Sequence, residues 1–166
     1  MTKLYIAGPM TGIPEYNFPA FMRAAEVLRQ NSYEVVNPAE LDMQNPEMAK
    51  VLAKATAPWG CPEGMTLKDF MKRDLPALLE CDGIVLLPGW ATSAGVKIER
   101  AVAGGVGMAE YSMHGPKIGS SYPYKSYLLT EFDGTRIIRE IPLGYVRPTG
   151  SVRTYDSRGG VSVPNA

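Results

Sequence analysis

The sequence predicts an α/β domain with a parallel sheet, because apolar runs that end in small-residue turns alternate with segments of helical periodicity. Residues 4–7 form one such run and lead into a glycine-containing turn at 8–12. Residues 84–87 form a second run, and a small-residue turn at 93–95 follows it and opens a helix. In α/β sheets, ligands bind at the turns where strands end and helices start. Two such turns predict a small-molecule site at one edge of the sheet.

The first part of the chain has the order strand, helix, strand. Residues 3–8 are expected to form a strand, and apolar positions at helical spacing place a helix over 18–30. A second strand is expected over 33–36, and Asn37-Pro38 ends it. A βαβ unit of this kind is normally right-handed.

The middle of the chain has a weaker pattern. A short helix is expected over 46–57, and glycine and proline predict a loop over 58–64. Thr66 is a candidate N-cap for a helix over 67–81. Pro76 stands inside that helix, and we expect it to bend the helix or weaken its middle, because proline lacks a backbone N–H group.

The alternation of strands and helices then continues. A third strand is expected over 83–88, followed by a helix over 94–104 that ends at Gly104-Gly105. A fourth strand is expected near 107–113. Strands separated by helices are the order from which parallel sheets are built.

The C-terminal part departs from this alternation. Residues 125–141 have the pattern of a β-hairpin with Asp133-Gly134 at its turn, which we place on the sheet edge or over the site. Residues 142–166 are rich in glycine, proline, serine and arginine, and are expected to form a tail without its own core, either disordered or draped over a neighbouring subunit. The prediction is therefore one domain over 1–141, its hairpin extension included, and a tail.

Composition narrows the classes of function. Apolar residues make up 45% of the 166 and charged residues 20%, as in ordinary globular domains. The 17 basic residues balance 17 acidic ones, so no nucleic-acid partner is expected. Two separated cysteines (Cys61 and Cys81) and one histidine (His114) are too few for a zinc site. No signal peptide and no apolar run of roughly 18 residues is recognisable, so we expect a cytoplasmic protein that makes no membrane contact.

Two carboxylates are candidates for chemistry. Glu99 stands about one turn into the helix that follows the third strand, and Asp74 lies in the preceding helix. If both helices flank that strand, both carboxylates approach its carboxyl end, and a close pair divides into one acid and one base. Enzymes that cleave glycosidic bonds use such pairs. In the alternative interpretation Asp74 is solvated and Glu99 pairs with Arg100 or Lys97.

The turn after the first strand is a candidate ligand-binding loop. Its glycines allow close approach to the backbone, and exposed N–H groups at a helix start favour anions. The alternative is a plain tight turn. The turn consists of Gly8, Pro9, Met10, Thr11 and Gly12.

Four further side chains have two interpretations each. Ser93 is either an N-cap or a hydroxyl offered to a phosphate, and the two are compatible. Trp90 and Trp59 either stack on a base or pack in the core. Tyr5 either packs in the core or directs its phenol toward a sugar.

Together these residues resemble the nucleoside 2-deoxyribosyltransferase superfamily, which includes the 2′-deoxynucleoside 5′-phosphate N-hydrolases. The resemblance covers about residues 3–106, and the chain looks like uncharacterised, often phage-encoded, relatives of that superfamily. Its most specific element is the Ser-x-Gly-x-x-x-Glu spacing of Ser93, Gly95 and Glu99. The other matches are 5–12, 73–75, 81–85 and Ala101.

The resemblance implies a flavodoxin-like (Rossmann-like) parallel sheet with flanking helices and no metal or organic cofactor. It implies that Glu99 is the nucleophile that attacks C1′ of the sugar while the base departs. It implies that Asp74 orients the sugar and helps proton transfer, that Tyr5 contributes to the pocket, and that the 8–12 turn lines the nucleotide site. Members of the superfamily form dimers or larger assemblies, so a homodimer or larger homo-oligomer is expected.

Ser93 bears on the substrate. At this position, transferases that act on free nucleosides carry an aspartate, whereas the nucleotide hydrolases carry serine. A carboxylate there would repel a 5′-phosphate, so Ser93 favours a nucleoside 5′-monophosphate. The expected activity is cleavage of the base–sugar bond of a (deoxy)nucleoside 5′-monophosphate through a glycosyl-glutamate intermediate. A nucleotide-binding protein without catalysis and a base-exchanging deoxyribosyltransferase remain open as alternatives.

Overall fold

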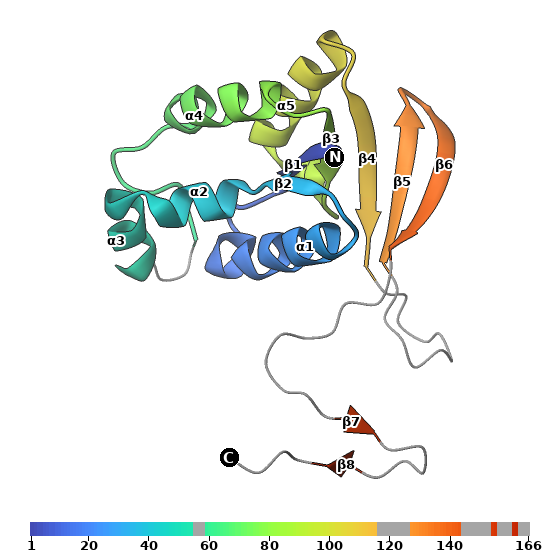
Figure 1. Ribbon diagram of the computed structural model, residues 1–166. Coiled ribbons are helices and arrows are strands. Elements are labelled where there is room, and N and C mark those ends of the chain that lie inside the picture. The colour runs from blue at the N-terminus through green and yellow to red at the C-terminus, as the bar shows by residue number, and fades with distance from the viewer. Residues whose placement is uncertain (55–58, 116–126, 144–153, 156–160, 163–166) are drawn as a thin grey trace.

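The computed structural model describes residues 1–54, 59–115, 127–143, 154–155 and 161–162, and its body is a six-stranded sheet (Figure 1). The strands are β1 (Lys3–Ala7), β2 (Glu34–Val36), β3 (Gly83–Leu86), β4 (Ala109–His114), β5 (Tyr127–Asp133) and β6 (Arg136–Leu143). They are ordered β2-β1-β3-β4-β5-β6. The first four run parallel, whereas β5 pairs antiparallel with β4 and with β6. The predicted α/β class with a largely parallel sheet is confirmed.

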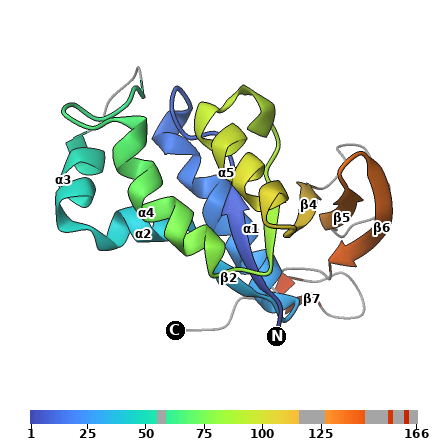
Figure 2. The ribbon, with the colours of Figure 1, turned by 90° about the horizontal axis from the view of Figure 1, so that it is seen from above.

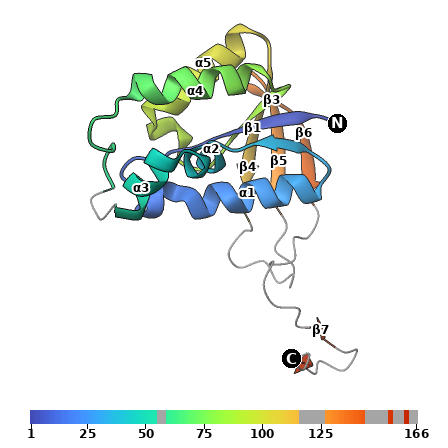
Figure 3. The ribbon, with the colours of Figure 1, turned by 60° about the vertical axis from the view of Figure 1, so that its left-hand side comes forward.

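Helices cover both faces of the parallel strands (Figure 3). α1 (Phe18–Gln30) packs on one face, and α4 (Leu67–Leu79) and α5 (Ala94–Gly105) pack on the other. Each of these helices connects consecutive parts of the sheet, as expected for a parallel arrangement. The sheet is therefore buried on both faces where these helices lie.

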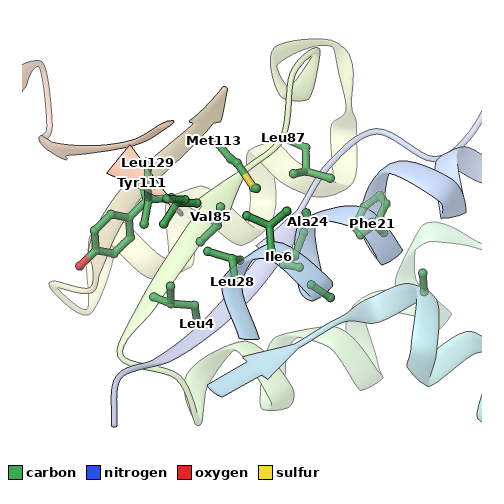
Figure 4. Close-up of a cluster of buried hydrophobic side chains, with 14 residues drawn as sticks. Leu4, Ile6, Phe21, Ala24, Leu28, Val85, Leu87, Tyr111, Met113 and Leu129 are labelled. Carbon is green, nitrogen blue, oxygen red and sulfur yellow. The ribbon is translucent and has the colours of Figure 1, made fainter. Parts of the chain in front are cut away.

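Strand β1 shows how the sequence divides the core between the two faces. Leu4 and Ile6 pack on the α1 face, whereas Tyr5 and Ala7 pack on the α4 and α5 face, because successive side chains of a strand point to opposite sides. All four are buried. Figure 4 shows the α1-side cluster, in which the labelled side chains are Leu4, Ile6, Phe21, Ala24, Leu28, Val85, Leu87, Tyr111, Met113 and Leu129.

Two short helices follow β2. The sequence pattern did not predict α2 (Pro38–Gln44), which begins where the Asn37 side chain accepts a hydrogen bond from the Ala39 N–H at 3.0 Å. The short helix expected next is confirmed as α3 (Pro46–Lys54), and its last predicted residues, 55–57, lie outside the described residues. Asn followed by proline can both end a strand and cap the start of a helix, and Asn37-Pro38 does both here.

Helix α4 begins after Thr66, as predicted. The Asp69 carboxylate accepts hydrogen bonds from the Thr66 N–H at 3.0 Å and from its hydroxyl at 2.6 Å. The helix continues through Pro76 and ends at Leu79, so the missing N–H group does not interrupt it. Helix α1 has the predicted ends, and the remaining predicted helix and strand ends of the parallel part differ from the observed ones by at most two residues.

The predicted hairpin lies on the sheet edge, on the side of the molecule away from α3 (Figure 2). Its turn is one residue later than expected, because Asp133 pairs with Arg136 and leaves Gly134 and Thr135 between the strands. Gly134 has a φ of 60°, a left-handed conformation that suits glycine. Strand β6 runs to Leu143, two residues beyond the predicted limit.

The predicted tail is thus shorter than expected at its start. Leu143 is 2% exposed and joins the α1-side core, so the first two residues of the region 142–166 belong to the sheet. Further along, β7 (Thr154–Tyr155) and β8 (Val161–Ser162) pair antiparallel. The rest of the predicted tail lies outside the described residues.

Within the described part of the chain, no helix combines the length and the apolar character needed to cross a membrane. In the same residues no group of three or more His, Cys, Asp or Glu side chains is arranged to hold a metal ion.

Candidate active site at the carboxyl edge of the sheet

A cavity of about 490 Å³ lies at the carboxyl ends of β1 and β3, the edge at which the sequence places the site. Its volume is within the range of small-molecule sites, roughly 300–1,000 Å³. The lining includes four charged side chains, Asp42, Arg73, Asp74 and Glu99. Apolar side chains from α1, α3 and α4 complete the wall, among them Phe18, Phe21, Met48, Leu52, Phe70 and Met71. Such a lining suits a ligand with one apolar part and several hydroxyl groups.

Glu99 is the central charged group. It lies on α5, is 5% exposed, and its Oε1 accepts a hydrogen bond from the Tyr5 hydroxyl at 2.7 Å. Burial is the main cause that raises the pKa of Glu99; the Tyr5 hydrogen bond and the Arg73 charge lower it, the Asp74 charge raises it, and the net pKa is about 7. The carboxyl group therefore changes between its neutral and its charged form near neutral pH.

Tyr5 packs in the core, as one of its two interpretations expects, and its hydroxyl is directed to Glu99. Its ring is fully buried in the core between β1 and the α4 and α5 helices, and its hydroxyl meets Glu99. Burial, followed by the Glu99 charge, raises the pKa of Tyr5 well above its ordinary value, so the hydroxyl stays protonated as a donor. Tyr5 touches the cavity through Glu99 rather than lining it.

The alternative pairing of Glu99 is wrong. Arg100 points to β4, where its Nε and Nη2 donate to the Glu110 carboxylate at 2.7 and 2.9 Å. Lys97 is exposed, and neither basic residue lines the cavity. Successive positions of a helix face different directions, which separates these side chains from Glu99.

Asp74 also lies in the cavity wall, and the solvated alternative is wrong because the residue is only 5% exposed. Its Oδ1 accepts from Arg73 Nε at 2.8 Å and lies 2.6 Å from Arg73 Nη2. Arg73 Nη1 also donates to Asp42 Oδ1. Burial raises the pKa of Asp74, whereas the charge and hydrogen bonds of Arg73 lower it and the Asp42 charge raises it.

The turn after β1 forms one wall of the cavity. Gly8, Pro9, Met10 and Thr11 line it, whereas Gly12 does not. A Cβ atom on Gly8 would lie 3.0 Å from Leu87 Cβ and 3.1 Å from Phe21 Cζ, so a side chain here would press on both neighbours. Gly12 has a φ of 82°, and its N–H donates to the Trp59 carbonyl at 2.6 Å.

The start of α5 forms another wall. Ser93 caps the helix, because its Oγ accepts from the Val96 N–H at 3.3 Å, and Ser93 and Gly95 both line the cavity. A hydroxyl that accepts one hydrogen bond keeps its proton for a ligand. The N-cap and ligand interpretations of Ser93 therefore remain compatible.

The two tryptophans lie outside the cavity lining. The Arg100 guanidinium stacks over the Trp90 ring, 4.6 Å from its centre, and Trp90 packs against the core beside α5. The Trp59 ring meets the Tyr16 ring edge-on at 5.7 Å. The structure thus does not bring Trp90 together with the other predicted site residues.

Several cavity residues are not among the predicted site residues, and Asp42 and Tyr16 are two of them. Asp42, 3% exposed, belongs to the unpredicted helix α2, and no sequence signal pairs it with Arg73 across 31 positions. Tyr16 lies in a short left-handed segment, with a φ of 50°, and its hydroxyl donates to the Gly60 carbonyl at 3.0 Å. Asn17 at its end, whose side chain donates to the Pro9 carbonyl at 2.9 Å, is the residue type that signals such a turn.

Comparison with known families gives a match that covers the chain from the start of β1 into β4. A family model described as Domain of unknown function (DUF4406) matches residues 2–110. The chain belongs to this family. The matched part of the DUF4406 domain contains every predicted site residue and all five α-helices of the described chain, and it ends within β4, before the hairpin. No curated protein matches the chain. The description of DUF4406 names no activity, so a function has to be argued from the site.

Proposed function

We propose that the protein is an N-glycosidase that cleaves the base–sugar bond of a nucleoside 5′-monophosphate. The observation that carries the proposal is the buried Glu99 carboxyl, which accepts the Tyr5 hydroxyl at 2.7 Å and shares one cavity with Asp74. Paired carboxyl groups of unequal acidity are what glycosidic-bond cleavage requires.

In the first step the ionised Glu99 attacks C1′ of the sugar. The bond between C1′ and the base nitrogen breaks, its electron pair leaves with the base, and the base takes a proton from Asp74. In the second step a water molecule attacks C1′ of the glycosyl-Glu99, gives a proton to Asp74, and releases the Glu99 carboxylate. The raised pKa of Asp74, caused mainly by burial, supports its proton-exchanging role.

Ser93 supports a phosphate on the substrate. It caps α5 at the cavity wall, where backbone N–H groups and the helix dipole favour an anion, and its Oγ keeps a proton to donate. The turn at 8–11 follows the neighbouring strand β1 at the same edge of the sheet, and it supplies a second stretch of backbone to the same cavity.

The fold supports the same conclusion. The parallel order β2-β1-β3-β4 matches the first four strands of the flavodoxin-like order, and here an antiparallel hairpin takes the place of the next parallel strand. In such sheets ligands bind outside the carboxyl ends of the strands on either side of the point where strand order reverses, which here lies between β1 and β3. The cavity lies at that point.

The test is chromatography of the protein incubated separately with each ribo- and deoxyribonucleoside 5′-monophosphate. We expect release of a free base from at least one of them, loss of that release in Glu99→Gln, and retention in Glu110→Gln. Glu110 is the matched control because it is a hydrogen-bonded glutamate outside the cavity. Full turnover by Glu99→Gln, or no release from any nucleotide, would overturn the proposal.

The same incubations separate the alternatives. A product that forms only when a second free base is added would identify a base-exchanging transferase. Retention of a nucleotide without release of base would identify a binding protein. Light scattering during size-exclusion chromatography tests the homo-oligomer that the resemblance implies.

A further inference from the structure

The Asp74 carboxylate is held by one of its two oxygens. Both Arg73 contacts fall on Oδ1, at 2.8 Å from Nε and 2.6 Å from Nη2. No described residue donates a hydrogen bond to Oδ2. In the described part of the chain every fully buried side-chain oxygen has a hydrogen-bond partner, so Oδ2 is not fully buried. Oδ2 is therefore accessible, and because Asp74 lines the cavity, this oxygen is open to a ligand.

Asp42 holds the other end of the same guanidinium. Its Oδ1 accepts from Arg73 Nη1, so Arg73 connects a carboxylate of α2 to a carboxylate of α4. Asp42 is 3% exposed, and no other hydrogen bond to its side chain is formed by the described residues. A planar guanidinium between two carboxylates has a fixed orientation, because its N–H groups point in set directions.

The charged groups around Asp74 come from its own helix and from two other helices. Arg73 lies beside it on α4, Asp42 faces it from α2, Glu99 faces it from α5, and the protonated Tyr5 hydroxyl on β1 contacts Glu99. Arg73 is the basic side chain in the described cavity lining. It therefore opposes the mutual repulsion of three carboxyl groups.

We propose that Arg73, anchored by Asp42, is a positioning residue that occupies Oδ1 of Asp74 and so makes Oδ2 the oxygen that exchanges a proton with the ligand. A proton cannot reside on an oxygen that already accepts two guanidinium N–H groups without losing those contacts, so the guanidinium directs it to Oδ2. The proton-exchange role of Asp74 rests on the proposed function, whereas its fixation by Arg73 does not.

The first arm of the test needs no substrate. The side-chain carboxyl carbon of Asp74 is titrated by nuclear magnetic resonance in isotope-labelled protein, with Asp74→Asn used to assign the signal. We expect the pKa of Asp74 to rise in Arg73→Met, because the cation that lowers it is lost, and to stay near its original value in Arg73→Lys, which keeps the charge. An unchanged pKa in Arg73→Met would overturn the proposal.

The second arm separates position from charge. If base release is observed, we expect kcat to fall about 100-fold in Arg73→Lys, because the ammonium cannot fix Oδ1 as the fork does, even though the pKa of Asp74 is retained. We expect Asp42→Asn to lower kcat in the same direction, since it weakens the anchor of Arg73. Wild-type kcat in Arg73→Lys with a wild-type pH profile would overturn the positioning role.

Glu40→Gln is the matched control. Glu40 lies two residues from Asp42 on the same helix and accepts from Arg29 at 2.7 Å through each oxygen, but it does not line the cavity. We expect this variant to leave kcat and the pKa of Asp74 unchanged. If Arg73→Met does not fold, as judged by the loss of a cooperative thermal transition, Arg73→Lys and Asp42→Asn still decide the proposal. Failure of base release with a shifted Asp74 pKa would reject the proposed function alone.

Discussion

At the scale of single residues, the protein places opposing influences on one carboxyl group. Burial favours the neutral form of Glu99, whereas the Tyr5 hydroxyl and the Arg73 guanidinium favour the charged form. The balance leaves the pKa of Glu99 at about 7, above its ordinary value of 4.5. The group is therefore a carboxylate for part of the time at neutral pH, as a nucleophile has to be.

This pKa has a consequence for stability. The folded protein holds the Glu99 proton more tightly than the unfolded chain, so the contribution to stability is full below pH 4.5 and is lost as the pH rises toward 7. We expect Glu99→Gln, which cannot ionise, to gain about 3 kcal/mol relative to the original protein between pH 4 and pH 8. Denaturant unfolding at both pH values measures this, and a difference that is independent of pH would contradict it.

A second prediction concerns the Tyr5 hydroxyl. Tyr5→Phe removes the hydrogen bond that lowers the pKa of Glu99, so that pKa rises. Because attack needs the ionised form, the acid limb of the rate profile is expected to move to higher pH. The profile of base release against pH measures the shift, and an acid limb at its original pH would show that the hydrogen bond does not tune Glu99.

The residues of the site differ in how far the sequence predicts them. Glu99 and Asp74 were predicted because their placement after and before the third strand leads both to one strand end. Asp42 was not, because its partner Arg73 lies 31 positions away and on another helix. Trp90 has two interpretations in the sequence, and in the structure it packs against the core while the Arg100 guanidinium lies over its ring.

At the scale of elements, the site depends on how closely β1 and its following turn approach their neighbours. Gly8 packs against Leu87 and Phe21 so closely that a Cβ atom would make contacts of 3.0–3.1 Å, tighter than ordinary van der Waals contact. Gly104, in α5, has open space where its Cβ would stand. The two glycines therefore differ in what they do, although both were expected to mark turns or helix ends.

This difference predicts opposite effects of the same substitution. Gly8→Ala is expected to destabilise the protein by about 1–3 kcal/mol, because the new methyl group forces Leu87 and Phe21 to shift. Gly104→Ala is expected to stabilise it by about 0.5–1 kcal/mol, since alanine restricts the unfolded chain and favours the helix. Thermal or denaturant unfolding of both variants is the measurement, and a stabilised Gly8→Ala would contradict the packing.

The helices were predicted where their apolar positions repeat and missed where a local signal has two meanings. α1, α4 and α5 carry an apolar face that packs on the sheet, so periodicity revealed them. α2 is seven residues long, which is too short for a clear period. The Asn37 that caps it also follows the last residue of β2, and the sequence pattern predicts only the end of that strand. The shift of the hairpin turn has a similar origin, since Asp133 suits both a turn and a strand end.

At the scale of the whole molecule, the site and the C-terminal hairpin are separate parts of one sheet. The cavity lies at the carboxyl ends of β1 and β3, whereas β5 and β6 extend the other side of the sheet beyond β4 (Figure 1). The family match ends at residue 110, yet Leu129 and Leu143 complete the α1-side core. The hairpin therefore contributes to stability rather than to the cavity wall.

This arrangement predicts how the hairpin responds to substitution. Leu143→Ala is expected to destabilise the protein by about 2–4 kcal/mol, because it leaves a space in the shared core. Ile138→Ala, on the same strand but 59% exposed, is expected to change stability by no more than about 0.5 kcal/mol. Denaturant unfolding compares the two, and equal effects would show that β6 does not share the core of the sheet.

The sequence alone predicts the alternation of strands and helices apart from α2, the edge of the sheet at which the cavity lies, and the carboxyl pair Glu99 and Asp74. Periodicity, turn residues and spacing are local properties, and they suffice for these conclusions. Only the tertiary structure decided the Tyr5 hydroxyl on Glu99, the Asp42–Arg73–Asp74 connection and the position of the hairpin. Those contacts join positions far apart in the chain, where burial and geometry select the partners and no local pattern records the choice.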